Sequence, residues 1–120
     1  MFERTYNIKA VPASRPRVTK RVVYYPKTYA KFRQDWVLIT HHDWQLIYAE
    51  TKGAREYEFS YEVWFKLHPK RDIDNLFKSL TDPLVKAKVM PDDNLITESH
   101  ILKHFNSNKE KIKIVISKIK

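Results

Sequence analysis

Cysteine is absent from this sequence, and glycine occurs once, at Gly53. The absence of cysteine excludes disulfide frameworks, thiolate zinc sites and cysteine nucleophiles, so any metal must be bound through oxygen or imidazole ligands. P-loop and dinucleotide-binding folds need glycine-rich loops, because their backbones approach phosphate closely. A single glycine cannot build such a loop, and we therefore expect no nucleotide cofactor.

Long apolar runs are absent as well. No segment approaches the ~20 apolar residues that a membrane-spanning helix needs, and the amino-terminal stretch MFERTYNIKA has no apolar run of the kind found in signal peptides. The 120 residues suffice for one domain, residues 1–120, with a buried core. We therefore expect a cytoplasmic protein with no membrane partner.

Acidic residues are missing from a long stretch near the amino terminus. Between Glu3 and Asp35 there are nine basic residues and no acidic one, which leaves 14 basic residues against the 14 acidic ones elsewhere. The net charge of +9 is therefore local, and such a concentrated field suits a polyanion such as DNA. A basic loop that only aids solubility is the alternative. The DNA-binding candidates within this stretch are Arg15, Arg17, Lys20, Arg21, Lys27 and Lys31. Arg71, further along the chain, is another candidate.

Alternation of apolar and polar residues predicts the strands. Residues 5–11 alternate as an opening strand, and residues 21–25 favour a short strand or hairpin. Two further strands are expected within residues 95–105 and 111–119, joined by a turn at residues 106–110. The longest pattern, within residues 53–68, places on one face Tyr57, Phe59, Tyr61, Val63, Phe65 and Leu67.

Two helices are predicted between these strands. Thr28 is a suitable N-cap for the first, whose apolar stripe is Tyr29, Phe32, Trp36 and Ile39. The second starts near Asp74 and uses leucines at four-residue spacing, and Pro83 should bend it or end its first part. The order of elements predicts an α+β fold, a two-layer sandwich of a mixed sheet and two main helices.

Two aspartates lie one residue apart in the segment RDIDNLFK, residues 71–78. In an extended chain side chains repeat every two residues, so Asp72 and Asp74 would point the same way and share a site. Neighbouring carboxylates repel unless they bind a cation or share a proton, and oxygen ligands suit Mg²⁺ or Mn²⁺. Lys78 lies one helical turn after Asp74, where it can neutralise phosphate charge or form an ordinary ion pair.

A second acidic pair, Asp92 and Asp93, follows the predicted helix. One of these residues can complete a three-carboxylate site where the helix returns the chain to the sheet. A structural interpretation is equally available, since Asp74 and Asn75 are good helix N-caps. Asp92 is likewise suited to a turn. Spacing alone leaves both interpretations open.

The segment KRDIDNLFKSLTDPLVKAKVMPDD, residues 70–93, resembles the signature region of the RusA family of Holliday-junction resolvases, the crossover junction endodeoxyribonucleases. The shared order is an arginine, Asp-x-Asp-Asn-Leu, a lysine one turn later and a downstream Asp-Asp. The amino-terminal strand and the loop RPRVTKR are similar more loosely, and Pro83 within the helix is a departure. The resemblance implies a RusA-like fold, an Asp92 of secondary importance, an Arg71 that contacts DNA or the active site, and catalytic residues Asp72, Asp74, Asp93 and Lys78.

By the same resemblance the three catalytic aspartates bind Mg²⁺, for which Mn²⁺ can substitute. It also implies a homodimer that cuts four-way DNA junctions in recombination and repair. Phage or prophage origin is common in such a family, so the resemblance implies a bacterial or phage-infected cell. Two alternatives stay open: a less selective nuclease for branched or duplex DNA, and a DNA-binding module whose aspartates only cap a helix.

Overall fold

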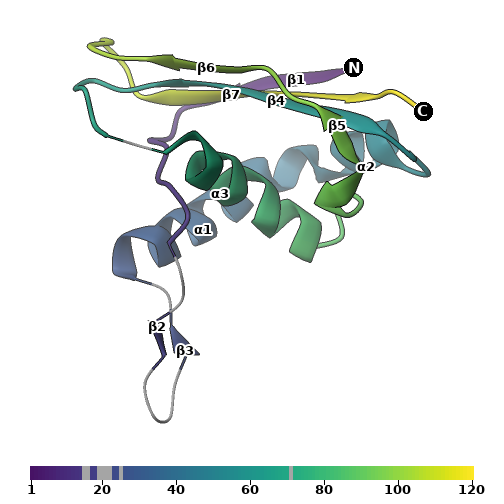
Figure 1. Cartoon of the computed structure of the whole chain (residues 1–120), viewed down its shortest axis with the longest axis horizontal. Coiled ribbons are helices and arrows are strands. Elements are labelled where there is room, and N and C mark those ends of the chain that lie inside the picture. Colours follow the sequence, from purple (N-terminus) through teal and green to yellow (C-terminus); the bar gives the residue numbers. More distant parts are fainter. Residues whose placement is uncertain (15–16, 19–22, 25, 71) are drawn as a thin grey trace.

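A mixed sheet of five strands forms one layer of the protein, and helices cover one of its faces (Figure 1). This computed structural model describes residues 1–14, 17–18, 23–24, 26–70 and 72–120. Strand β4 lies centrally: it pairs antiparallel with β7 and parallel with β5 and β6, while β1 pairs antiparallel with the other edge of β7. The strands are β1 (Phe2–Tyr6), β4 (Tyr57–Trp64), β5 (Ile96–Glu98), β6 (Ile101–His104) and β7 (Lys111–Lys118).

The second layer consists mainly of two helices of equal length, α1 (Lys27–Thr40) and α3 (Ile73–Lys86). A 3₁₀ turn, η1 (His41–Asp43), connects α1 to the shorter α2 (Trp44–Thr51), and η2 (Asp93–Leu95) precedes β5. The predicted α+β, two-layer arrangement with a mixed sheet is confirmed. Within the described residues, none of the helices has the length and apolar character that crossing a membrane requires.

The predicted apolar faces meet between the layers. Leucines 76, 80 and 84 of α3 are fully buried against β4, whose residues Tyr57, Phe59, Tyr61 and Val63 are at most 2% exposed. Tyr29, Phe32 and Trp36 of the α1 stripe are buried in the same core, and Ile39 is partly buried against it. The indole Nε1 of Trp36 donates to the carbonyl oxygen of Leu80 at 3.0 Å. Each large side chain removed from water in this way stabilises the fold by roughly 1.5–3 kcal/mol.

Three strand predictions need correction. The strand expected within residues 95–105 is divided into β5 and β6, which pair with successive parts of β4. β1 spans Phe2–Tyr6 rather than residues 5–11, because the amide of Ile8 donates to the carbonyl oxygen of Tyr6 at 3.0 Å in a tight turn that ends the strand. Ala10 is buried beyond that turn, which explains the misleading alternation. β4 ends at Trp64, so Phe65 is still buried but Leu67 is 77% exposed in a loop.

Two helix predictions also differ from the structure. Thr28 is not the N-cap of α1, because the helix begins at Lys27 with Pro26 at the cap position and no side-chain cap hydrogen bond. The fixed φ of proline allows it to precede a helix closely. Pro83 does not end α3 either: the helix continues to Lys86, and Pro83 is buried within it.

A small hairpin of β2 (Arg17–Val18) and β3 (Val23–Tyr24) extends from the helical side of the molecule, away from the sheet (Figure 1). This confirms the hairpin expected near residues 21–25. The chain that leads to the hairpin is fixed beside α3, since the amide of Ala13 donates to the carbonyl oxygen of Asn75 at 2.8 Å. The basic amino-terminal segment therefore emerges next to the first turn of α3.

Candidate active site

The first acidic pair lies at the start of α3. Asp72 has an extended backbone and is the N-cap of the helix, where its Oδ1 accepts a hydrogen bond from the amide of Asp74 at 3.0 Å. Both side chains are exposed. The cap is therefore Asp72 rather than Asp74 or Asn75, and it uses one carboxylate oxygen of the pair.

The phenol of Tyr61 fixes this helix start to the sheet. Its hydroxyl donates to the carbonyl oxygen of Ile73 at 2.9 Å. Burial raises the pKa of Tyr61, and the charges of Asp74 and Asp72 raise it further. The phenol thus remains a protonated donor, and it lies close enough to the first acidic pair to sense both charges.

The second acidic pair is fixed in the same manner by Tyr57, four residues before Tyr61 on β4. The hydroxyl of Tyr57 donates to the carbonyl oxygen of Pro91 at 2.8 Å, and Asp92 Oδ1 caps η2 by accepting from the amide of Asn94 at 2.9 Å. Burial raises the pKa of Tyr57, with smaller contributions from the charges of Asp93 and Asp92. The predicted turn at Asp92 is confirmed.

Negative charge accumulates around Asp93. Burial raises its pKa, as do the hydrogen bond that protonated Asp93 donates to Asp92 and the charges of Asp92 and Asp82. Asp82 belongs to α3, two turns after Asp74 along the helix. A cation bound here would relieve the mutual repulsion of these carboxylates.

The two acidic pairs lie along one side of the molecule but do not converge. Tyr57 and Tyr61 are four residues apart on the same face of β4, so the points to which they fix the two segments are roughly 13 Å apart. Throughout the part of the chain that the structure describes, no three His, Asp or Glu side chains are arranged to hold one metal ion. By donor type each pair fits Mg²⁺, but a single centre of Asp72, Asp74 and Asp93 is not formed here and stays a prediction.

Lys78 lies on the second turn of α3 and is exposed. In the described ranges it forms no salt bridge with Asp74, so the ordinary helical ion pair does not account for it. Its position on the helix lies between Asp74 and Asp82, each four residues away. A cation at this place can meet a phosphate that lies along α3.

Only some of the basic candidates are among the residues that the structure describes. Arg15, Lys20, Arg21 and Arg71 lie outside the described residues, and only the backbone of Arg17 is described. Lys27 and Lys31 are exposed on the first turns of α1, and the Nζ of Lys31 is 3.0 Å from an Asp35 carboxylate oxygen. The predicted basic surface is therefore represented in the structure by the start of α1.

Sequence reasoning missed the two anchoring tyrosines and Asp82. Tyr57 and Tyr61 were counted only as apolar members of a strand face, although buried phenols usually need a hydrogen-bond partner. The presence of two tyrosines on the predicted buried face was the available signal. Asp82 continues the four-residue series that contains Asp74 and Lys78.

Together these features define a class: an α+β protein with carboxylates exposed along one helix, beside a strongly basic amino-terminal segment. The family model described as Endodeoxyribonuclease RusA matches residues 7–117. The chain therefore belongs to the RusA family, and the resemblance in residues 70–93 is confirmed.

Among curated proteins, the chain is similar to the Crossover junction endodeoxyribonuclease RusA of Aquifex aeolicus (strain VF5). The two sequences are 41% identical over 75 residues, which cover 61% of this chain and 60% of the relative. The chain thus matches about three-fifths of the length of that relative.

Proposed function

We propose that this protein is an endodeoxyribonuclease that resolves four-way DNA junctions by paired hydrolysis of phosphodiester bonds, in recombination and repair. The observation that supports this most is the family match, because residues 7–117 include the basic segment and both acidic pairs. The similar protein from Aquifex aeolicus carries the name of a crossover junction endodeoxyribonuclease.

We assign the catalytic roles to Asp72, Asp74, Asp93 and Lys78. The first two, exposed at the start of α3, would hold Mg²⁺ with Asp93 contributing from η2. Bound Mg²⁺ would supply a more acidic water and polarise the scissile phosphate. Lys78 would stabilise the charge that develops on that phosphate, and Mn²⁺ would substitute for Mg²⁺ because both ions accept hard oxygen ligands.

Binding would be electrostatic and would involve both the hairpin segment and the start of α1. Arg15, Arg17, Lys20 and Arg21 lie close together in the sequence, and Lys27 and Lys31 add exposed positive charge at the start of α1. Arg71 precedes Asp72 directly and would contact the strand that is cut. We propose that the protein acts as a homodimer, because paired cuts in two strands need two related sites on a nearly two-fold substrate.

A fixed four-way junction and a linear duplex of the same sequence, each incubated with Mg²⁺ and with EDTA, test this function. Symmetric nicks in the junction, dependent on Mg²⁺ and absent from the duplex, are expected. Equal cutting of both substrates would instead indicate a less selective nuclease.

One observation favours a non-catalytic DNA-binding module as the alternative: Asp72 and Asp92 both serve as caps in the structure. Such a module would bind the junction in a salt-dependent manner. It would cut neither substrate at any Mg²⁺ concentration.

A further inference from the structure

A hollow lies at the end of the sheet from which the chain approaches Asp72. It has a volume of about 570 Å³, and its walls include Phe65, Leu67, His68 and Pro69, with Lys9 and Lys66 beside them. This volume is within the range of pockets that accept small organic ligands, roughly 300–1,000 Å³. We propose that this hollow, termed the tip pocket, receives one unstacked nucleotide of branched DNA next to the cut; this inference rests on the proposed function.

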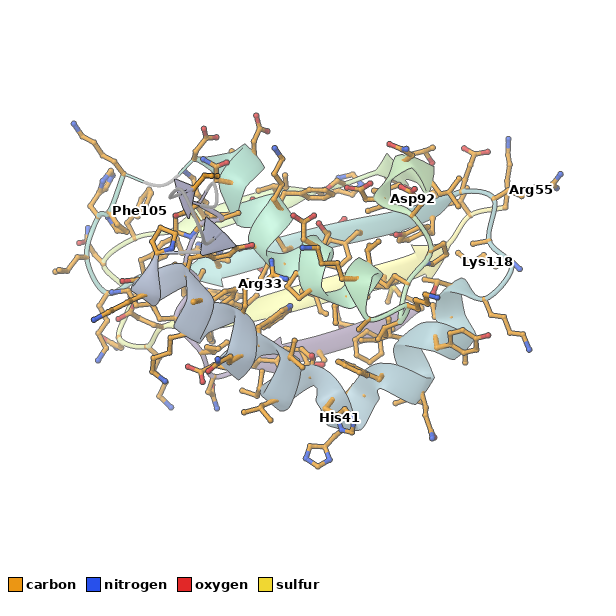
Figure 2. The ribbon with its side chains drawn as sticks, turned by 90° about the horizontal axis from the view of Figure 1, so that it is seen from below. Arg33, His41, Arg55, Asp92, Phe105 and Lys118 are labelled. Atoms are coloured by element: carbon orange, nitrogen blue, oxygen red, sulfur yellow. The ribbon has the colours of Figure 1, made fainter. Side chains whose placement is uncertain are left out.

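The backbone around the tip pocket is held by hydrogen bonds between two loops. The amide of Ser107 donates to the carbonyl oxygen of Phe65 at 2.9 Å, and the amide of Asn106 donates to the carbonyl oxygen of Leu67 at 3.3 Å. The ring of His68 stacks on Phe105, with 3.8 Å between the centroids. Figure 2 shows Phe105 at the end of the molecule opposite Asp92. The tip is thus a formed surface at the Asp72 end of α3.

The chemistry of the walls suits a nucleotide. Leu67 is 77% exposed although it continues an apolar face, and with Pro69 and the His68 ring it offers flat apolar contact to a base. Lys9 and Lys66 are exposed beside it and can meet the phosphates. The acidic residue at the rim is Glu110, whose carboxylate oxygen lies 3.9 Å from the Nζ of Lys9.

Two neighbouring features point to DNA rather than to a free small molecule. Lys9 also lines a second hollow, of about 430 Å³, whose walls include Lys27 and Lys31. The two hollows therefore share Lys9 and connect the tip to the start of α1, and their four lysines outnumber the two acidic residues that also line them, Asp35 and Glu110. Asp72 follows Pro69 by three residues, which span at most ~10 Å. Since a DNA strand advances ~3.4 Å per nucleotide, the bound nucleotide would lie within about three positions of the cut.

Abasic scanning of a synthetic four-way junction tests the tip pocket. Binding of the full chain is measured in EDTA, with single abasic sites placed at successive positions around the junction. For the wild-type protein we expect an affinity loss of roughly fivefold or more at one position near the cut. Leu67→Ser should weaken binding of the intact junction to a similar extent and be insensitive to that abasic site, because both changes remove one contact.

Leu38→Ser is the matched control, since Leu38 is 70% exposed on α1 and lies outside the tip pocket. This variant should retain both wild-type affinity and sensitivity to the abasic site. The inference would be overturned if no abasic position lowers the affinity of the wild-type protein. It would also be overturned if the affinity losses caused by Leu67→Ser and by the abasic site multiply when the two changes are combined. If the wild-type protein still nicks the intact junction with Mg²⁺, such a result removes the tip pocket alone; absence of both binding and nicking removes the proposed function as well.

Discussion

The start of α3 and the turn that follows it carry the same residue type under different conditions. Asp72 and Asp74 are exposed at the helix start, with Lys78 one turn along. Asp92 and Asp93 lie together near Asp82, and this crowding contributes to the raised pKa of Asp93. Each segment is fixed by the hydroxyl of one tyrosine of β4. The same kind of tyrosine hydrogen bond thus holds one acidic pair near a lysine and the other near a third aspartate.

From this contrast we infer different roles for the two segments. The first lies where the basic amino-terminal segment meets α3, through the hydrogen bond between Ala13 and Asn75, so it faces the expected DNA. In the second, the charges of Asp92 and Asp82 raise the pKa of Asp93, so this segment would gain more from a bound cation. We therefore expect substitutions in the first segment to affect catalysis most, and substitutions in the second to affect metal binding and stability as well.

Substitution of Asp72 should have the largest effect on junction cutting. Asp72→Asn should reduce junction cutting by at least about 10²-fold, because a charged ligand is lost at the reacting phosphate. Asparagine is as good an N-cap as aspartate, so folding and junction binding should be retained, as circular dichroism and gel-shift assays would show. Asp92→Asn is the matched variant of the other segment and should retain most cutting; equal losses in both would remove the distinction between the segments.

Lys78→Met should lower the cutting rate by roughly 10²-fold, since in the proposed site it removes a positive charge beside the scissile phosphate. Junction affinity should change only a few-fold, because Lys78 is one of many cations. Lys52→Met, an equivalent change at the exposed C-cap of α2, serves as control. Single-turnover kinetics separate the two effects, and unchanged single-turnover cutting by the Lys78 variant would contradict its catalytic role.

Removal of either anchoring hydroxyl should have a moderate effect. Tyr57→Phe and Tyr61→Phe each lose one partly buried hydrogen bond, so the free energy of unfolding should fall by about 1 kcal/mol. Denaturant titration measures this change. Because Tyr57 holds the Asp93 turn and Tyr61 holds the Asp72 cap, cutting should fall in both variants; wild-type cutting at saturating Mg²⁺ would show that the anchors are only structural.

The smallest expected effect concerns pH and Asp93. Its pKa is raised in the folded protein, so the associated stability is present below the ordinary pKa of aspartate and is lost as pH rises through the raised value. Asp93→Asn removes that loss, and in EDTA it should raise the melting temperature slightly at pH 7 but not at pH 3. The gain should be only a few tenths of a kcal/mol, because exposed charges are screened by solvent. A lower melting temperature at pH 7 would contradict the repulsion inferred around Asp93.

Much of the fold follows from apolar spacing, and the exceptions have physical causes. The faces of β4, α1 and α3 were predictable because buried side chains repeat with the period of the element. The length of β1 was not, since a backbone turn after Tyr6 ends it while Ala10 remains buried. Leu67 continues the pattern of β4 but lies beyond its end, because pattern alone does not locate the last ladder hydrogen bond.

The sequence supports a hypothesis about the members of the candidate site, whose roles stay predictions, but it gives little information on their geometry. The acidic pairs at residues 72, 74, 92 and 93 stand out in the sequence, and the order of motifs is specific to the family. Whether they meet depends on how the chain returns after α3, a helix of 14 residues and about 21 Å in length. Sequence spacing gives no information on that return, and the anchors at Tyr57 and Tyr61 became evident only from their hydroxyl contacts.

Counting the Mn²⁺ ions bound by the protein in its complex with a four-way junction addresses the proposal that both acidic segments serve one metal-dependent reaction. The electron paramagnetic resonance signal of free Mn²⁺ gives this number for the wild-type chain, Asp72→Asn and Asp93→Asn, with the junction alone as background. We expect each variant to lose at least one ion relative to the wild-type complex. Equal numbers of bound ions in all three complexes would contradict the assignment of Asp72, Asp74 and Asp93 as metal ligands.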